Sequence, residues 1–151
     1  MDNCVFCKIV NGEIPSAKVW EDENFLAFLD IKPSTKGMTL VVPKKHFDSY
    51  IFQAPEEEVM TLFKAAKKVA GMLEKAFDID RVAMVAEGIG VNHLHVKLYP
   101  LHGVKGKFIP KEPKENMYFE KYEGFVSTQL GPQIDYGELN KLAEQIRKTN
   151  E

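Results

Sequence analysis

The sequence predicts an α+β fold with a mainly antiparallel sheet, one long central helix and one short C-terminal helix. Three observations support this class of fold. Short β-rich runs alternate with turns, one long stretch has the apolar spacing of a helix, and no βαβ unit is repeated along the chain. The chain has 151 residues, of which 44% are hydrophobic and 28% charged, so it suits a single globular domain.

The expected strands are runs of β-branched and aromatic residues that end at turn-forming residues. These runs lie at residues 18–31, 38–42, 81–86 and 93–99. The first run divides into two short strands around a turn at residues 21–24. Pro43 and Pro100 end the second and fourth runs, because proline lacks the N–H that a central strand needs. Residues 87–92 predict a short turn that contains glycine.

The long central helix is expected to begin at Pro55 and to run to about Ala76. Proline suits the first position of a helix. The carboxylates of Glu56, Glu57 and Glu58 then lie beside the positive end of the helix dipole. The apolar residues that follow repeat at helical spacing: Val59, Leu62, Phe63, Ala66, Ala70, Leu73 and Phe77.

Residues 1–103 are expected to form the main domain, and residues 104–151 an extension packed on it. Residues 103–116 are rich in Lys, Gly and Pro and predict a loop, whereas residues 117–128 alternate weakly and predict at most one added strand. A short C-terminal helix follows. Its signals are Asp135 and Glu138 as capping residues and Leu139, Leu142 and Ile146 as apolar positions.

Composition and charge exclude several kinds of partner. The net charge is −2 and the pI about 6.1, which argues against a general nucleic-acid binder. No apolar run approaches the roughly 18 residues that span a membrane, and the N-terminal stretch lacks a signal-peptide pattern, so we expect no membrane partner and a cytoplasmic location.

Cys4 and Cys7 have C-x-x-C spacing, which in a reducing compartment indicates a metal site or a redox pair.

The most informative segment is the predicted last strand. Successive side chains of a strand point to opposite faces. One face is expected to present His93, His95, Lys97 and Tyr99, and the core-facing side Leu94, Val96 and Leu98. Two imidazoles and an ammonium group in register suit a site that holds an anion. The alternative is a half-buried strand whose polar face happens to contain two histidines.

This segment resembles the H-x-H-x-H signature of the histidine-triad (HIT) family, in which x is apolar. Three upstream stretches are similar to the family in the same order and at similar distances: Cys4–Pro15, Trp20–Ile31 and Leu40–His46. The resemblance covers roughly residues 3–103 and implies a HIT-like fold. It also implies a homodimer formed largely by the central helix and the sheet edges.

The resemblance implies roles for individual residues. His95 matches the middle histidine, the family's nucleophile, which attacks the α-phosphate and becomes nucleotidylated. Asp30 matches the acidic residue that accepts hydrogen bonds from the ribose hydroxyls. The residues that match the apolar sandwich around the base are Val5, Phe6, Ile9, Phe28 and Ile31.

General chemistry is consistent with His95 as a nucleophile. An imidazole has a reference pKa of about 6.5, so much of it is unprotonated at neutral pH. It attacks through one nitrogen only if the other nitrogen keeps its proton, commonly by donating to a backbone carbonyl. A covalent intermediate then divides one difficult displacement into two easier ones.

The sequence departs from the family at the third histidine, where Lys97 stands instead. An ammonium group neutralises phosphate charge but is a poor proton shuttle near neutral pH unless burial lowers its pKa. Lys97 is therefore a phosphate clamp, a general acid toward the leaving group, or a solvated lysine. His102 is expected to be a surface residue, with replacement of the third histidine as the alternative. Lys105 and Lys107 either reach an anionic substrate or belong to a solvated loop.

The loop before the histidines also departs from the family. Ala86 stands where the family has an Asn, the loop is shorter, and it contains no Gln. The backbone N–H groups of Gly88 and Gly90 are the substitute candidates for contacts with phosphate. Glu87 would repel a polyphosphate unless it is paired.

The resemblance also implies a zinc site. Zinc prefers four tetrahedral ligands from Cys and His. In the zinc-containing branch of the family, the ligands that complete Cys4 and Cys7 match His46 and His93. Such a zinc is structural, because the protein fills all four positions. A redox-active thiol pair and inert cysteines are the alternatives.

The leading hypothesis is an enzyme, a nucleotide hydrolase or nucleotidyltransferase. It would cleave a phosphoramidate or a dinucleoside polyphosphate through a nucleotidyl-His95 intermediate. The expected ligand is a nucleotide, with a purine favoured, and the expected metal is Zn²⁺. Two alternatives stay open, namely a nucleotide-binding protein with weak or lost catalysis and a zinc-stabilised interaction scaffold without nucleotide affinity.

Overall fold

The computed structural model describes residues 3–112, 118–122 and 131–151. Five strands form one antiparallel sheet in the order β1-β2-β3-β5-β4, which confirms the predicted fold class. The strands are β1 Lys18–Glu21, β2 Phe25–Leu29, β3 Thr39–Pro43, β4 Val82–Val85 and β5 Val96–Pro100. The helices are α1 Val5–Val10, the 3₁₀ helix η1 Ile51–Gln53, α2 Glu56–Phe77 and α3 Tyr136–Lys148.

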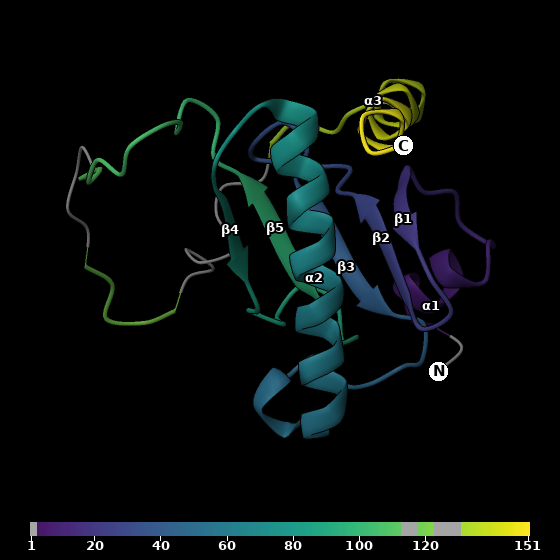
Figure 1. Ribbon diagram of the computed structural model, residues 1–151. Coiled ribbons are helices and arrows are strands. Elements are labelled where there is room, and N and C mark those ends of the chain that lie inside the picture. Colours follow the sequence, from purple (N-terminus) through teal and green to yellow (C-terminus); the bar gives the residue numbers. More distant parts are fainter. Residues whose placement is uncertain (1–2, 113–117, 123–130) are drawn as a thin grey trace.

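The long helix α2 crosses one face of the sheet (Figure 1). Its buried side chains recur at helical spacing and join the main core: Leu62, Ala65, Ala66, Val69 and Leu73. The helix begins at Glu56, one residue after the predicted start, with Pro55 as its N-cap, and it ends one residue beyond the predicted Ala76. It ends there because Asp78 adopts a left-handed conformation, with φ 51°, and its N–H bonds to the carbonyl of Glu74.

The opposite face of the sheet is covered by α1. Because strand side chains alternate, β2 and β3 present a second apolar set to this face. That set is Leu26, Phe28, Leu40 and Val42, and Phe6 of α1 packs on it. The sheet therefore separates the main core under α2 from a smaller cluster under α1, and the candidate site lies on the α1 side.

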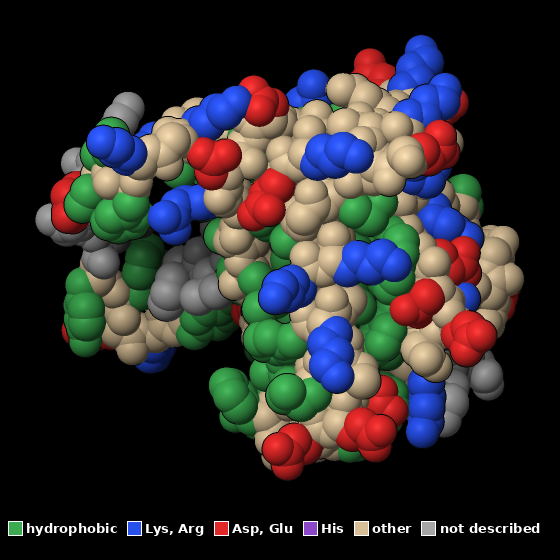
Figure 2. All heavy atoms as spheres, in the orientation of Figure 1, with side chains coloured by type: hydrophobic (Ala, Val, Ile, Leu, Met, Phe, Trp, Pro, Cys, Tyr) green, Lys and Arg blue, Asp and Glu red, His purple; other side chains and the backbone are tan. Residues whose placement is uncertain are grey.

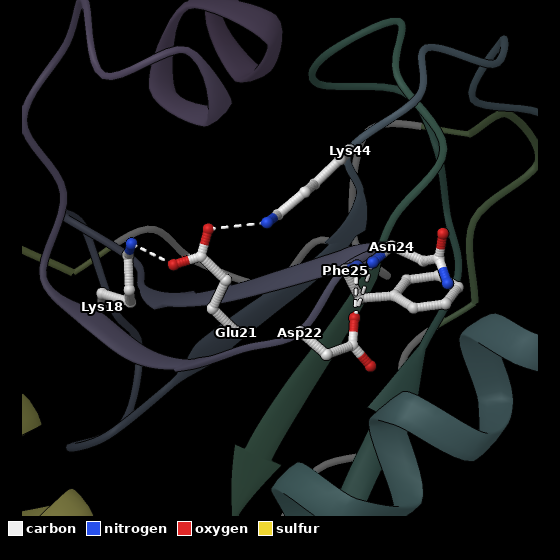
Figure 3. A network of polar contacts seen from close by, with 6 residues as sticks. All are labelled: Lys18, Glu21, Asp22, Asn24, Phe25 and Lys44. Carbon is white, nitrogen blue, oxygen red and sulfur yellow. Dashed lines mark hydrogen bonds and ion pairs between the residues drawn. The ribbon is translucent and has the colours of Figure 1, made fainter.

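The β1–β2 hairpin turns where the sequence predicts (Figure 3). One carboxylate oxygen of Asp22 accepts hydrogen bonds from the backbone N–H groups of Asn24, at 2.9 Å, and Phe25, at 2.7 Å. Glu21 forms ion pairs with Lys18 and Lys44, the latter at 2.7 Å, and so links β1 to the residue after β3. Partly exposed ion pairs stabilise weakly, so the Asp22 turn is the stronger constraint on this hairpin.

The C-terminal helix α3 forms where it is predicted. The side chain of Asp135 accepts a hydrogen bond from the Gly137 N–H at 2.8 Å and caps the helix. Buried residues of α3 join the main core beside β1 and α2: Leu139, Ala143 and Ile146. Leu142 is only partly buried.

Between β5 and α3, the residues that the structure describes form no helix or strand. Residues 103–112 form no helix or strand, in agreement with the predicted loop. The strand suggested for residues 117–128 is absent from residues 118–122, and the rest of that stretch lies outside the described residues. Among the helices that the structure describes, none combines the length and the apolar character that crossing a membrane would require.

The last strand, β5, is shorter than predicted, because it begins at Val96 rather than at His93. Its ladder with β3 stops where Val41 pairs with Val96. Beyond that point Pro43 has no N–H to offer, and the N–H of Leu94 bonds instead to the carbonyl of Phe47 at 2.9 Å. The two histidines therefore precede the strand, although side chains still alternate: Leu94 and Val96 join the main core, whereas the rings of His93 and His95 pack on Phe6 at the opposite face.

Candidate active site

Two groups of side chains meet at the start of β5, one around a cavity and one around a cluster of cysteine and histidine. His95 and Lys97 both line the cavity, as expected of two residues on one face. The expectation that His93 shares this face is confirmed, because its ring packs edge-to-face on Phe6 of α1, as that of His95 does. The His93 side chain is fully buried and enters the cysteine–histidine cluster rather than the cavity lining.

The cavity has a volume of about 260 Å³ and lies on the α1 face of the sheet. Nine of the residues that sequence reasoning assigned to the nucleotide line it: Val5, Phe6, Ile9, Phe28, Asp30, Ile31, Gly90, His95 and Lys97. Its wall is completed by Ile14, Pro15, Ser16, Leu29, Leu40, Val91 and Tyr136. The lining is mainly apolar, with imidazole, ammonium and carboxylate groups from separate elements.

The register of the sheet places these polar groups beside apolar side chains of β2 and β3. Phe28 pairs with Leu40, and Leu40 pairs with Lys97, so the three side chains form a row across β2, β3 and β5. Asp30 directly follows β2 and holds the next turn by accepting the Lys32 N–H at 2.8 Å. The row therefore joins the carboxylate at one side of the cavity to the imidazole and ammonium at the other.

The ring of Phe6 links the cavity to the cluster. Its centroid lies 5.3 Å from that of His95, 5.6 Å from Phe28 and 5.9 Å from His93, with edge-to-face geometry in each case. Phe6 stands between the two cysteines in the sequence, so the position of the cluster decides where this ring packs. The apolar wall of the cavity is therefore linked to the cysteines through Phe6.

His95 is 4% exposed, and its Nδ1 lies 2.6 Å from the carbonyl oxygen of His93. A carbonyl only accepts, so Nδ1 carries the proton and Nε2 keeps a lone pair in the neutral ring. Burial lowers the pKa of His95, the nearby Lys97 lowers it further, and the bond to His93 and the charge of Asp30 oppose this. A neutral imidazole at pH near 7 is thus favoured.

The cluster contains Cys4, Cys7, His46 and His93, whose ligand atoms all lie within 4.8 Å of one another. The Nδ1 atoms of the two histidines are 3.3 Å apart. The Cys4 sulfur lies 3.4 Å from His93 Nδ1, and the Cys7 sulfur lies 3.4 Å from His46 Nδ1. Both cysteines are free rather than joined in a disulfide.

The donor set of this cluster fits a metal ion. His93 Nε2 lies 2.8 Å from the carbonyl of Pro43, so Nε2 carries the proton and the Nδ1 lone pair points into the cluster. Two sulfurs and two ring nitrogens that converge in this way match the tetrahedral Cys₂His₂ set that zinc prefers. Burial, the hydrogen bond that the Cys7 thiol donates to Cys4 and the charge of Cys4 raise the pKa of Cys7, so a thiolate there requires a nearby cation.

The two glycines proposed for phosphate lie in different surroundings. Gly90 lines the cavity, and a Cβ atom there would meet nothing within 4 Å. Gly88 does not line it and has φ +72°, with its ideal Cβ only 2.5 Å from the Ser49 carbonyl oxygen. The Ser49 hydroxyl also donates to the Gly88 carbonyl at 2.6 Å, so Gly88 is needed for close backbone packing.

The other predicted departures lie away from the cavity. Ala86 packs against the main core, on the α2 side of the sheet. His102 is exposed, its Nε2 lies 2.8 Å from the Lys36 carbonyl, and it does not replace the third histidine in the cavity lining. Lys105 forms an exposed ion pair with Asp78 and is likewise not part of that lining. Lys107 is exposed as well.

Sequence reasoning missed some of the cavity residues. Residues 14–16 come shortly after α1 in the sequence, so their position near Ile9 could have been inferred from the sequence. Tyr136 comes from the first turn of α3, more than a hundred residues after Asp30, and no local pattern relates the two.

Comparison with known proteins agrees with the fold and shows the family. The family model described as "HIT domain" matches residues 11–103, more than half of the chain. The match places the chain in the histidine-triad class of proteins, and this chain belongs to the HIT family. A HIT-like protein of Methanocaldococcus jannaschii is 44% identical over 111 residues, covering 70% of this chain and 84% of that protein.

Other relatives bear on function and on metal. The adenosine 5′-monophosphoramidase of Saccharomyces cerevisiae is 32% identical over 123 residues, 78% of this chain and 75% of that protein. A crystal structure of a HIT-like protein from Bartonella henselae has a TM-score of 0.71 at 29% identity, covering 99% and 97% of the two chains. A zinc-bound histidine-triad protein from Mycobacterium smegmatis has a TM-score of 0.62 at 25% identity, covering 98% and 93%.

Proposed function

We propose that this protein is a nucleotide hydrolase or nucleotidyltransferase that works through a nucleotidyl-His95 intermediate. The observation that most supports this is one cavity that contains His95, with its Nε2 lone pair, together with Asp30 and an apolar wall. Such a cavity offers a nucleophile, a partner for ribose hydroxyls and a surface for a base. The yeast monophosphoramidase among the relatives favours a phosphoramidate as substrate over a dinucleoside polyphosphate.

The reaction consists of two displacements at phosphorus. In the first, the Nε2 lone pair of His95 attacks the α-phosphorus, the bond from phosphorus to the leaving nitrogen or oxygen breaks, and the leaving group takes up a proton from solvent. In the second, water attacks the phosphorus and loses a proton to solvent, the bond to Nε2 breaks, and a nucleoside monophosphate leaves. The hydrogen bond from Nδ1 to the His93 carbonyl stabilises the positive charge that the ring acquires in the intermediate.

Lys97 acts on the phosphate in this proposal. Its register position beside Leu40 places the ammonium group on the same cavity face as His95, where it offsets the negative charge of the phosphate. A clamp of this kind lowers the barrier without moving a proton, so a general acid is not required of it. Gly90 is the glycine whose backbone N–H we assign to phosphate, since Gly88 packs on Ser49.

Replacement of His95 tests the enzymatic claim. With adenosine 5′-phosphoramidate as substrate, His95→Ala should release AMP at least about a thousandfold more slowly than the wild type, because the nucleophile is lost. His102→Ala is the matched histidine control and should retain the wild-type rate. AMP release is measured by chromatography in a time course. Equal rates for His95→Ala and wild type contradict the proposal.

The same assay separates the alternatives. A wild type that binds AMP tightly but produces none from the phosphoramidate supports a nucleotide-binding protein that has lost catalysis. A wild type without affinity for AMP supports a zinc-stabilised scaffold.

In Lys97→Met we expect a rate lower by about 10²–10⁴-fold rather than complete loss, in line with removal of one positioned charged group.

We also propose that the Cys4, Cys7, His46 and His93 cluster holds a structural zinc ion. The convergent ligand atoms, the proton on His93 Nε2 and the zinc-bound relative from Mycobacterium smegmatis support this. A reducing compartment such as the cytoplasm, which we expect from the sequence, keeps both thiols available as ligands.

Elemental analysis tests the zinc proposal. Protein purified without added metal should contain about one zinc per chain. His46→Ala should lose the metal and unfold at a lower temperature, because two sulfurs and a buried imidazole are left without a cation. His102→Ala should keep both the metal and the unfolding temperature. A metal-free wild type that is fully folded would falsify the proposal.

A homodimer through α2 and β4 is the third part of the proposal. β4 lies at an edge of the sheet, and no other described strand pairs with its outer side. An apolar groove of about 380 Å³ runs between α2 and β4, and exposed hydrophobic side chains border it: Met60 at 56%, Phe63 at 41% and Met84 at 41%. Figure 2 shows hydrophobic side chains gathered along this flank of α2. A second copy would cover this surface and pair the two β4 edges.

The oligomeric state in solution tests the dimer. Met84→Lys should shift the mass measured by light scattering from dimer to monomer, because a charge would be buried in the apolar contact. Ile109→Lys replaces an exposed apolar residue away from this groove, and it should remain dimeric. A wild type that is monomeric at all concentrations tested argues against this part of the proposal.

A further inference from the structure

Among the described residues of the C-terminal extension, Tyr136 is the one that lines the candidate nucleotide site. Tyr136 is the first residue of α3 and lines the same cavity as His95 and Asp30. It lies outside residues 11–103, which match the HIT family model. The wall it forms is therefore an addition to the part of the chain that the family model describes.

The segment before Tyr136 is fixed to the loop that follows Asp30. The N–H of Ile134 donates to the carbonyl of Ile31 at 2.9 Å, and the N–H of Gly131 donates to the carbonyl of Lys32 at 3.3 Å. The approach at Gly131 is so close that an added Cβ would lie 1.9 Å from the carbonyl oxygen of Pro33. Only glycine fits there, and the segment follows the loop through direct backbone contact.

The other end of α3 is held by the core. Buried side chains along the helix pack beside β1 and α2. The Asn150 side chain donates to the carbonyl of Met72 at 3.1 Å, and Arg147 donates to the carbonyl of Lys18. With both ends anchored and Asp135 capping the first turn, the position of Tyr136 in the cavity wall is set by the fold.

This position is on the nucleoside side of the cavity. Tyr136 is tied to the chain that leaves β2, whereas His95 and Lys97 belong to the chain that enters β5. β3 lies between these strands, which separates them by roughly 10 Å, or two strand spacings. With His95 on the α-phosphorus and Asp30 on the ribose, a ring beside Ile31 faces the base rather than the phosphate.

We propose that Tyr136 is a base-contacting residue, through which the C-terminal extension contributes to nucleoside affinity and not to the chemical step. This inference rests on the proposed nucleotide function. An aromatic ring that packs on a base contributes about 1–3 kcal/mol, which corresponds to roughly a 5- to 150-fold change in affinity. Ring surface is the property that matters, so the hydroxyl group is dispensable.

Titration calorimetry with two probes tests the inference. Tyr136→Ala and Tyr136→Leu should bind AMP about tenfold more weakly than the wild type, whereas Tyr136→Phe should bind it equally well. All of them should bind ribose 5-phosphate, which has no base, as the wild type does. Tyr118→Ala is the matched control, since Tyr118 belongs to the extension and is 88% exposed. In turnover of adenosine 5′-phosphoramidate, Tyr136→Ala should raise KM and leave kcat unchanged.

The outcomes separate this inference from the proposed function. If the wild type binds AMP and Tyr136→Leu and Tyr136→Ala bind it equally well, the role of Tyr136 is wrong and the nucleotide site stands. An equal loss of affinity for AMP and for ribose 5-phosphate also overturns it, because the contact would then not be with the base. If the wild type binds neither probe, the nucleotide function fails, and this inference fails with it.

Discussion

The position of His93 is the constraint on which the rest of the site depends. Its side chain enters the cysteine–histidine cluster, its Nε2–H is held by the carbonyl of Pro43, and its own carbonyl accepts the proton on His95 Nδ1. One residue thus connects the cluster to the proposed nucleophile through a single peptide unit. If His93 moved, the tautomer and the direction of the His95 ring would change together.

The same constraint reaches the apolar wall of the cavity. Phe6 lies between the two cysteines in sequence and packs its ring against both His93 and His95. The short helix α1 has only six residues and too few internal hydrogen bonds to hold its place alone. The cluster gives it a fixed position on the sheet, and so a cavity of defined shape forms from a segment that would otherwise be marginal.

Much of the fold and site follows from local patterns in the sequence. The spacing of apolar residues from Val59 to Phe77 defines α2, and the capping residue Asp135 marks the start of α3. The residues matched to the HIT family gather around one cavity, because antiparallel register brings Phe28, Leu40 and Lys97 into a row. The local patterns and the family resemblance predict the same elements, because both depend on the apolar faces that α2 and the strands bury.

The features that sequence reasoning missed depend on contacts between distant residues. Alternation places His93 and His95 on one face, as found, but it does not reveal that His93 enters the cluster while His95 lines the cavity. Gly88 was assigned to phosphate from composition, whereas its positive φ serves close packing on Ser49. The place of Tyr136 depends on hydrogen bonds between residues 131–134 and residues 31–32, which no periodicity reveals.

The stereochemical course at phosphorus tests the central claim, a covalent bond between His95 and the nucleotide, most directly. An adenosine 5′-phosphoramidate made chiral at phosphorus with sulfur is hydrolysed in ¹⁸O-labelled water, and the configuration of the product is determined. Each in-line displacement inverts phosphorus, so attack by His95 followed by attack by water predicts overall retention. Overall inversion would mean that water attacks the substrate directly, and the covalent role of His95 would be contradicted.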